Sequence, residues 1–257
     1  MTERGMVRTP LWGAYEAFAM IAGLGALAVL CLAWLPFAML LTPLLPRRIG
    51  RPLGRVVISR GFRAYLRFLE LACASRFDLA ELDRLRDAGP LVVAANHPSL
   101  LDAVMIVSRL PNAVCVMKAS LLDNILFGAA ARLAGYIRND APLEMILGAR
   151  GELERGAQVV IFPEGTRTSR FPIDRCQPAA GLMAQRAKVP VQTLLIDFST
   201  PYLGKAWPLF RPPVLPLSCR IRLGRRFPPP NDAALFAAEL EAYFSVEAPT
   251  YPASAAA

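Results

Sequence analysis

The apolar and polar positions divide the chain into an N-terminal hydrophobic segment and a longer part in which short apolar runs alternate with amphipathic segments. Short apolar runs predict buried strands, here at Leu91–Ala95, Ala113–Met117 and residues 159–162, 189–196 and 219–223. The segments between and after them predict helices, at residues 103–108, 121–133, 144–155, 181–188 and 233–244. Strands alternating with helices indicate an α/β fold with a mostly parallel sheet flanked by helices.

Residues 11–45 are almost continuously apolar, with interruptions at Glu16 and Pro36. Crossing a bilayer takes about 20 such residues, so this segment is too long for one span and too short for two. It predicts either one tilted transmembrane helix around residues 17–35, ended by Pro36, or a helical hairpin embedded in one leaflet and turning near residues 23–25. A cleaved signal peptide fits less well, because the apolar run is too long and lacks a small-residue cleavage site.

Seven arginines come after the hydrophobic segment, interleaved with apolar residues: Arg47, Arg48, Arg51, Arg55, Arg60, Arg63 and Arg67. This pattern predicts a basic amphipathic helix on a membrane surface; the other interpretation is the solvated charged face of an ordinary helix. By the positive-inside rule, the arginines place the segment after the anchor on the cytoplasmic side.

Composition agrees with a membrane-associated protein. Of 257 residues, 54% are hydrophobic, the mean hydropathy is +0.37 and the net charge is +9. A basic chain favours anionic lipids, nucleic acid or an acidic carrier protein, but no nucleic-acid motif accompanies the charge, so we expect no nucleic-acid partner. Five scattered cysteines and a single histidine predict neither a disulfide framework nor a zinc site, and we expect no metal or cofactor.

The single histidine, His97, directly follows the first of these apolar runs, in the sequence Asn-His-Pro-Ser-Leu-Leu-Asp that ends at Asp102. Pro98 suits the first turn of a helix, which would place Asp102 within reach of the imidazole. A carboxylate on one ring nitrogen fixes the tautomer and leaves the other nitrogen free to accept a proton. The alternative is a structural histidine beside a helix-capping aspartate.

A second polar turn follows the strand at residues 159–162, in Phe-Pro-Glu-Gly-Thr-Arg, with Glu164, Gly165, Thr166 and Arg167. Parallel α/β sheets place their sites beyond the carboxyl ends of the strands. Arg167 can bind a phosphate bidentately, and Gly165 allows close backbone approach. The other interpretation of Glu164 and Arg167 is a salt bridge that shapes the turn.

These two motifs resemble those of the glycerophospholipid acyltransferases, which include 1-acylglycerol-3-phosphate and lysophospholipid acyltransferases. Residues 96–102 resemble the family's His-x4-Asp motif and residues 162–167 its Phe-Pro-Glu-Gly-Thr-Arg motif, within a likeness that runs from about residue 91 to 196. The resemblance implies that Glu164, Gly165, Thr166 and Arg167 line the acceptor site. Arg138 resembles a phosphate-binding arginine of a middle motif, although it comes earlier than usual. Lys118 is a weaker candidate, whose alternative is a solvated strand end.

The resemblance implies a membrane-bound enzyme of phospholipid biosynthesis. It would transfer a fatty acyl group from a thioester, acyl-CoA or acyl carrier protein, to the hydroxyl of 1-acylglycerol-3-phosphate, with His97 as general base and Asp102 orienting it. Its partners would be this donor, the lysophospholipid acceptor and membrane lipids. The alternatives are another lysolipid or glycolipid acceptor, or a non-catalytic membrane lipid-binding protein.

These interpretations divide the chain into four segments: an N-terminal membrane anchor (1–50), a basic amphipathic interfacial helix (51–76), an α/β acyltransferase catalytic domain on the cytoplasmic face (77–245) and a disordered tail (246–257).

Overall fold

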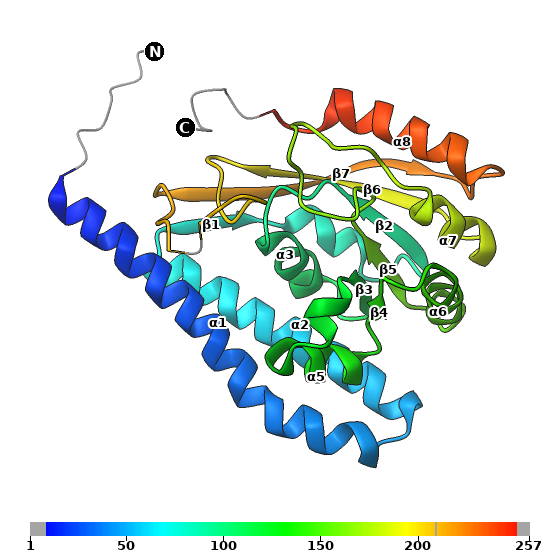
Figure 1. Ribbon diagram of the computed structural model, residues 1–257, viewed down its shortest axis with the longest axis horizontal. Coiled ribbons are helices and arrows are strands. Elements are labelled where there is room, and N and C mark those ends of the chain that lie inside the picture. Colours follow the sequence, from blue (N-terminus) through cyan, green and yellow to red (C-terminus); the bar gives the residue numbers. More distant parts are fainter. Residues whose placement is uncertain (1–8, 209, 251–257) are drawn as a thin grey trace.

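The computed structural model describes residues 9–208 and 210–250, and a seven-stranded sheet forms their centre (Figure 1). The strands are β1 (Ser75–Asp78), β2 (Leu91–Ala95), β3 (Ala113–Met117), β4 (Ile137–Arg138), β5 (Gln158–Ile161), β6 (Val191–Phe198) and β7 (Leu217–Phe227). Their spatial order is β1-β7-β6-β2-β5-β3-β4, and every neighbouring pair is parallel except β6 with β7. The predicted mostly parallel α/β sheet is confirmed.

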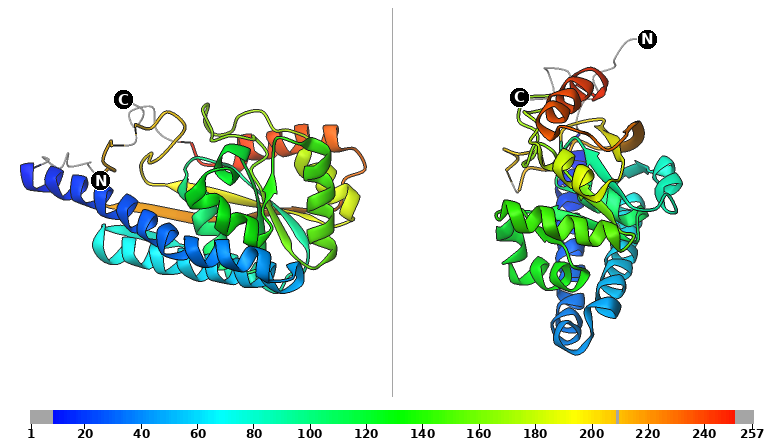
Figure 2. Two further views of the ribbon diagram at one scale, coloured as in Figure 1. Left: turned by 60° about the horizontal axis from the view of Figure 1, so that its bottom comes forward. Right: turned by 90° about the vertical axis from the view of Figure 1, so that its right-hand side faces the viewer.

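Helices cover both faces of the sheet, as expected for parallel strands. One face carries α2 (Arg47–Ala72) and α3 (Leu101–Arg109); the other carries α6 (Pro142–Glu154), α7 (Ala179–Ala187) and α8 (Ala233–Glu247) (Figures 1 and 2). Strand β2 is buried on both sides: Leu91, Val93 and Ala95 join the α2–α3 core, and Val92 and Ala94 join the α6–α8 core. A 3-10 helix, η1 (Ala80–Leu85), precedes β2, and two short helices, α4 (Ala119–Leu122) and α5 (Ile125–Ala134), connect β3 to β4.

The N-terminal apolar segment forms one unbroken helix, α1 (Pro10–Leu44), which runs through Pro36. The helix does not end at Pro36, as the prediction of one transmembrane helix required. It also does not turn near residues 23–25, as the prediction of a helical hairpin required. A proline removes one backbone hydrogen bond, and an apolar helix can continue past it. Gly23 serves packing instead, because its Cα faces Leu69 of α2 so closely that a Cβ would lie 3.2 Å from that side chain.

α1 is also long and apolar enough to cross a membrane, by length and composition, and within the described ranges it is the one such helix. It packs against the domain at both ends: the Glu16 carboxylate accepts a hydrogen bond from the Leu215 N–H at 3.1 Å, and Ala38 is buried with Ala129 and Leu133 of α5.

The basic segment forms α2, which begins at Arg47 rather than at residue 51, and β1 already begins at Ser75. Several of its arginines face the protein rather than a membrane. Arg51 and Arg55 both pair with Glu152 of α6, and Arg63 donates to the Ser108 carbonyl oxygen. At these three positions the prediction that the helix rests on a membrane surface is therefore wrong. The arginine side chains bind a buried carboxylate and a carbonyl oxygen near the end of α3 instead.

The chain end also differs from the expectation. α8 continues to Glu247, so residues 246 and 247 are helical and not part of a disordered tail as predicted. Residues 251–257 lie outside the described residues. β7 extends beyond the predicted residues 219–223 on both sides and pairs with β6 over most of its length.

Candidate active site

His97 and Asp102 meet at the carboxyl end of β2. The backbone from Pro98 to Leu100 is not helical, and α3 begins at Leu101, so Pro98 does not occupy the predicted first helical turn. The bend brings His97 Nδ1 to 2.8 Å from Asp102 Oδ2. With the carboxylate accepting the Nδ1 hydrogen, Nε2 is the nitrogen that can take a proton. The His97 side chain is 15% exposed, which leaves an approach for a substrate.

Asp102 is completely buried, and only one of its two carboxylate oxygens accepts hydrogen bonds from the described residues. Oδ2 accepts a further hydrogen bond from the Ser99 backbone N–H at 2.8 Å, whereas Oδ1 has no hydrogen-bond partner among the described residues. Burial raises the pKa of Asp102, against the opposing effect of the hydrogen bond with His97. A carboxylate in this environment is stabilised when the neighbouring imidazole becomes charged.

Glu164 braces the loop that carries His97. Its Oε1 accepts hydrogen bonds from the His97 backbone N–H at 3.0 Å and from Thr168 Oγ1 at 2.8 Å, and its Oε2 accepts one from the Asp174 N–H at 2.9 Å. Burial raises the pKa of Glu164, and these donors oppose the rise. Within the described residues, Glu164 forms no ion pair with Arg167, so the turn is shaped by backbone donors and a hydroxyl instead.

Two further contacts fix the histidine from the second motif. The Phe162 ring stacks on the imidazole with 3.7 Å between ring centroids and 13° between planes. The Thr168 backbone N–H donates to the His97 carbonyl oxygen at 2.8 Å. The loops after β2 and β5 are thus held together around the imidazole, as expected for neighbouring parallel strands.

Arg167 lies against the irregular segment that comes after β6. Its Nη1 donates to the carbonyl oxygens of Leu203 at 2.9 Å and Gly204 at 2.7 Å, and the Leu203 oxygen also accepts from the Leu100 N–H. Burial lowers the pKa of Arg167, and the charge of Asp102 opposes this. Through the Leu203 carbonyl oxygen, Arg167 is linked to the Leu100 N–H of the loop that also carries His97.

Gly165 and Thr166 form the exposed tip of the same turn. Gly165 has φ +69°, and its N–H donates to the Phe162 carbonyl oxygen at 2.9 Å. A Cβ there would meet open space, so the positive φ, and not a close approach, explains the glycine.

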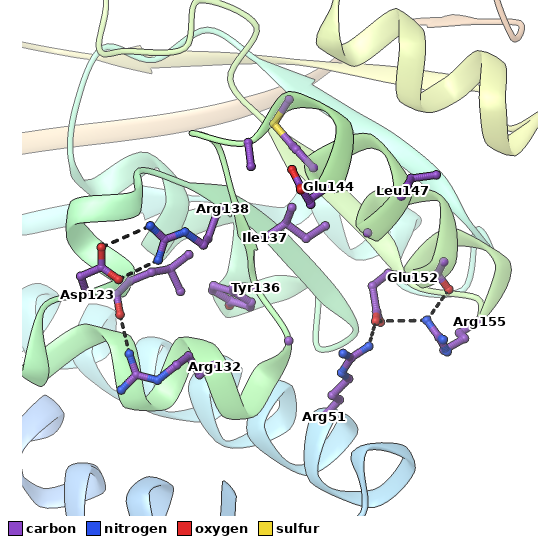
Figure 3. Close-up of a pocket in the computed structure, with 16 residues that line it drawn as sticks. Arg51, Asp123, Arg132, Tyr136, Ile137, Arg138, Glu144, Leu147, Glu152 and Arg155 are labelled. Carbon is purple, nitrogen blue, oxygen red and sulfur yellow. Dashed lines mark hydrogen bonds and ion pairs between the residues drawn. The ribbon is translucent and has the colours of Figure 1, made fainter.

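Lys118 and Arg138 lie farther along the same sheet edge. Lys118 is exposed after β3, and Arg138 ends β4, three strand spacings, or about 14 Å, from β2. Arg138 pairs with Asp123 and Asp140 and lines a pocket of about 580 Å³ between α5 and α6 (Figure 3). Arg51 and Glu152 line another part of this pocket. Neither Lys118 nor Arg138 contacts the His97 cluster.

Several residues that build the site were not predicted: Ser99, Thr168, Asp174, Leu203 and Lys205, whose Nζ donates to Ser169 Oγ at 2.9 Å. Ser99 had a signal, since Ser-x-x-Asp before an apolar run is a helix-start pattern. The other residues lie in irregular loops. Such loops have no hydrophobic periodicity from which their course could be predicted. The structure has no group of three or more His, Cys, Asp or Glu placed to hold a metal in residues 9–208 and 210–250.

Comparison with known proteins finds acyltransferases. Residues 76–197 match the family model described as Acyltransferase. Over 138 residues the chain is 28% identical to the human 1-acyl-sn-glycerol-3-phosphate acyltransferase beta, covering 51% of this chain and 50% of that protein. Over 136 residues it is 30% identical to a Drosophila melanogaster lysophosphatidylcholine acyltransferase, covering 50% of this chain and 25% of that protein. The matched part therefore spans half or less of these relatives.

The fold has a solved counterpart, the crystal structure of the 1-acyl-sn-glycerophosphate (LPA) acyltransferase, PlsC, from Thermotoga maritima. The TM-score is 0.64 at 17% identity, over 93% of this chain and 94% of that one. At this identity the likeness concerns the fold alone. Residues 76–197 match the acyltransferase family, as the paired motifs indicated. Its relatives include 1-acylglycerol-3-phosphate and lysophosphatidylcholine acyltransferases.

Proposed function

We propose that the protein is a membrane-bound acyltransferase that moves a fatty acyl group from a thioester, acyl-CoA or acyl carrier protein, to the hydroxyl of 1-acylglycerol-3-phosphate. The observation that carries the proposal is the 2.8 Å contact between His97 Nδ1 and a buried Asp102, with Arg167 held to the Leu203 carbonyl oxygen that the His97 loop also contacts. The His97 imidazole can take a proton from a substrate hydroxyl, and the Arg167 guanidinium can bind a phosphate. Both groups follow the carboxyl ends of neighbouring strands, which suits a lysolipid that carries a hydroxyl and a phosphate.

The reaction needs no covalent enzyme intermediate, because a thioester is already activated. The acceptor oxygen attacks the thioester carbonyl carbon while His97 Nε2 takes the hydroxyl proton. The C–S bond then breaks, and the thiolate takes the proton back from the imidazolium. Asp102 holds the tautomer and stabilises the imidazolium, and Phe162 keeps the ring in plane.

Replacement of His97 by Ala tests the reaction. We expect acyl transfer to fall by about 10²- to 10⁴-fold, since that is the range for a positioned general base, while vesicle binding is retained. The assay uses detergent-solubilised protein, radiolabelled lysolipids and both donor types. Unchanged activity would contradict the assigned base, and a wild-type protein that binds lipid without transferring acyl groups would indicate a lipid-binding protein.

Replacement of Arg167 by Ala tests the acceptor. A hydrogen bond between charged groups is worth about 1.5–3 kcal/mol, so we expect kcat/KM to fall about 10- to 100-fold on a phosphate-bearing acceptor and less on a phosphate-free lysolipid. Arg170→Ala is the matched control, because Arg170 is an exposed cation on the same loop. Equal losses on both acceptors would point instead to loosening of the Leu203–Gly204 loop, which Arg167 also holds.

Another lysolipid acceptor is the second candidate. Arg138, a proposed phosphate ligand, is already paired with Asp123 and Asp140, and one relative is named a lysophosphatidylcholine acyltransferase. The acceptor panel separates the two candidates, because a lysophosphatidylcholine-specific enzyme would prefer that substrate even with Arg167 intact.

The membrane location rests on α1. Its exposed face carries large apolar side chains, including Phe18, Ile21, Leu32 and Phe37, while its other face packs on the domain. An arrangement in which α1 lies within one leaflet and the domain lies on the cytoplasmic face satisfies both sets of contacts.

A further inference from the structure

A second exposed apolar surface lies outside α1, on the helices that come after β3 and β4. It consists of five large side chains, which we call the edge patch: Leu121 of α4, Ile125 and Phe127 of α5, and Leu143 and Leu147 of α6. Ile125 is 66% exposed, Leu143 69% and Leu147 56%. Leu143 and Leu147 are four residues apart and therefore share one face of α6.

The chain path places the edge patch at the same edge of the sheet as the candidate active site, on the helices that follow β3 and β4. The α4–α5 segment leaves the sheet after Met117, the last residue of β3, and returns at β4, where Arg138 is paired with Met117. α6 begins at Pro142, soon after Arg138. α4 and α6 therefore start at the carboxyl edge of the sheet, and α5 follows α4 directly (Figure 1). His97 follows the carboxyl end of β2 at the same edge. Leu147 lines the pocket between α5 and α6 (Figure 3).

The edge patch and α1 are connected through α5. α5 packs on the C-terminal half of α1 through Ala129 and Leu133, which are buried against Ala38. The neighbours of Ala38 on α1, Phe37 and Met39, are both more than half exposed. The exposed apolar side chains of α1 and those of α5 therefore lie on two helices that pack against each other at Ala38, Ala129 and Leu133.

Positive charge borders the same surface. α2 starts with the exposed residues Arg47 and Arg48, and its next turns touch α5: a Cβ on Gly50 would lie 3.2 Å from Leu133, and one on Gly54 2.9 Å from the Ala134 nitrogen. The exposed acids Asp123, Asp140 and Glu144 also lie along the patch, and Arg138 pairs with the first two. With Arg47 and Arg48 at its border, the apolar surface is complementary to a bilayer with anionic headgroups.

We propose that the edge patch is a second membrane-contact surface, which rests on an anionic bilayer and turns the carboxyl edge of the sheet toward the leaflet. It rests on the proposed function, since a lysolipid acceptor enters from that leaflet. The patch holds the sheet edge that carries His97 close to the lipid surface. The lysolipid acceptor can then reach the imidazole while part of it stays in the bilayer interface.

The test compares two double variants of the full chain. Ile125→Ser with Leu143→Ser removes the core of the edge patch. Leu235→Ser with Val246→Ser is the matched control, because these residues are 72% and 81% exposed on α8, which α7 separates from α6 and which lies across the sheet from α5 (Figure 1). For each protein, acyl transfer is measured on a lysolipid in phosphatidylglycerol–phosphatidylcholine vesicles and on the same lysolipid in detergent micelles.

We expect the edge-patch variant to lose about tenfold in activity on vesicles relative to micelles, and the control variant to keep the wild-type ratio. An environment-sensitive fluorophore on Ile125→Cys, in a chain with Cys31→Ser, should shift to the blue when vesicles are added, whereas one on Leu235→Cys should not. Equal ratios for both variants together with no shift at residue 125 would overturn the proposal.

Two other outcomes are also decisive. If sedimentation in detergent shows a wild-type dimer that the edge-patch variant dissociates, a second copy of the chain covers the patch and the membrane assignment is wrong. If the wild-type protein transfers no acyl group to any acceptor, the proposed function fails, and the fluorophore at residue 125 still decides whether the patch contacts lipid.

Discussion

At the scale of single residues, Asp102 has the least favourable environment for a charge in the candidate site, because it is completely buried. Its Oδ2 accepts two hydrogen bonds, from His97 Nδ1 and the Ser99 N–H, and Oδ1 accepts none from the described residues. Burial therefore raises the pKa of Asp102 above its ordinary value of 3.8. A group with a raised pKa in the folded state binds its proton more tightly than in the unfolded state, so its contribution to stability falls as the pH rises.

Asp102→Asn should separate activity from stability. The amide oxygen can still accept from the Ser99 N–H, but no charge stabilises the imidazolium, so we expect acyl transfer to fall by on the order of 10²-fold or more. Thermal unfolding in detergent should show a Tm equal to or above that of the wild type at pH 7. The difference in Tm should grow as the pH rises from about 4 through the raised pKa of Asp102. A Tm that drops at neutral pH would show that the carboxylate stabilises the fold.

At the same scale, the sequence predicted the contact between His97 and Asp102 but not the residues that support it. His97 and Asp102 are five residues apart, so one turn determines their contact, and Ser99 lies inside that turn. Glu164 was expected to face the acceptor, yet both of its oxygens hold the His97 loop; its role toward a substrate remains a prediction. The carbonyl groups of residues 203 and 204, which hold Arg167, come from an irregular segment with no periodicity, so no local pattern could reveal them.

At the scale of elements, α2 is held to the domain by a buried charge cluster. Glu152 of α6 pairs with Arg51 and Arg55 of α2 and with the exposed Arg155 of its own helix. Arg55 also donates to the Ala134 carbonyl oxygen at 3.0 Å and to Asn112 Oδ1 at 2.9 Å. Arginines spaced along an amphipathic helix looked like a lipid-facing pattern, because a sequence does not show that a buried glutamate 97 residues later lies opposite them.

Glu152→Gln should destabilise the protein by about 3–5 kcal/mol, because it leaves the buried Arg55 charge without its counter-ion. Glu154→Gln is the matched control: Glu154 lies on the same helix and pairs at 2.7 Å with Arg150, but both side chains are more than half exposed. Such a surface pair is worth at most about 0.5 kcal/mol. Urea unfolding in detergent measures both variants. Similar free energies of unfolding would mean that the Arg55–Glu152 pair contributes no more than a surface ion pair.

At the scale of the whole molecule, the packing of α1 limits how the protein can sit in a membrane. Core contacts run along the helix from Glu16 and Ala19 to Ala38, a length of about 33 Å at 1.5 Å per residue. The hydrocarbon core of a bilayer is about 30 Å thick. If α1 crossed the bilayer, the parts of α2, α5 and the loop near Leu215 that touch it would have to enter the hydrocarbon with their polar groups. The hydropathy of residues 11–45 could not reveal this, because it is the same for a spanning helix and an in-plane one.

We therefore expect both ends of α1 to be accessible from the same side of the membrane. Single cysteines at Thr9 and Arg48, exposed positions that flank the helix, are introduced into a chain with Cys31→Ser, whose remaining four cysteines are buried. In sealed vesicles with the cytoplasmic face outward, a membrane-impermeant maleimide should label both, as well as a Val246→Cys marker on α8. A spanning helix would leave one end unlabelled until detergent is added. That result would mean that α1 leaves the domain in the membrane, and the contacts of Glu16 and Ala38 would have to open.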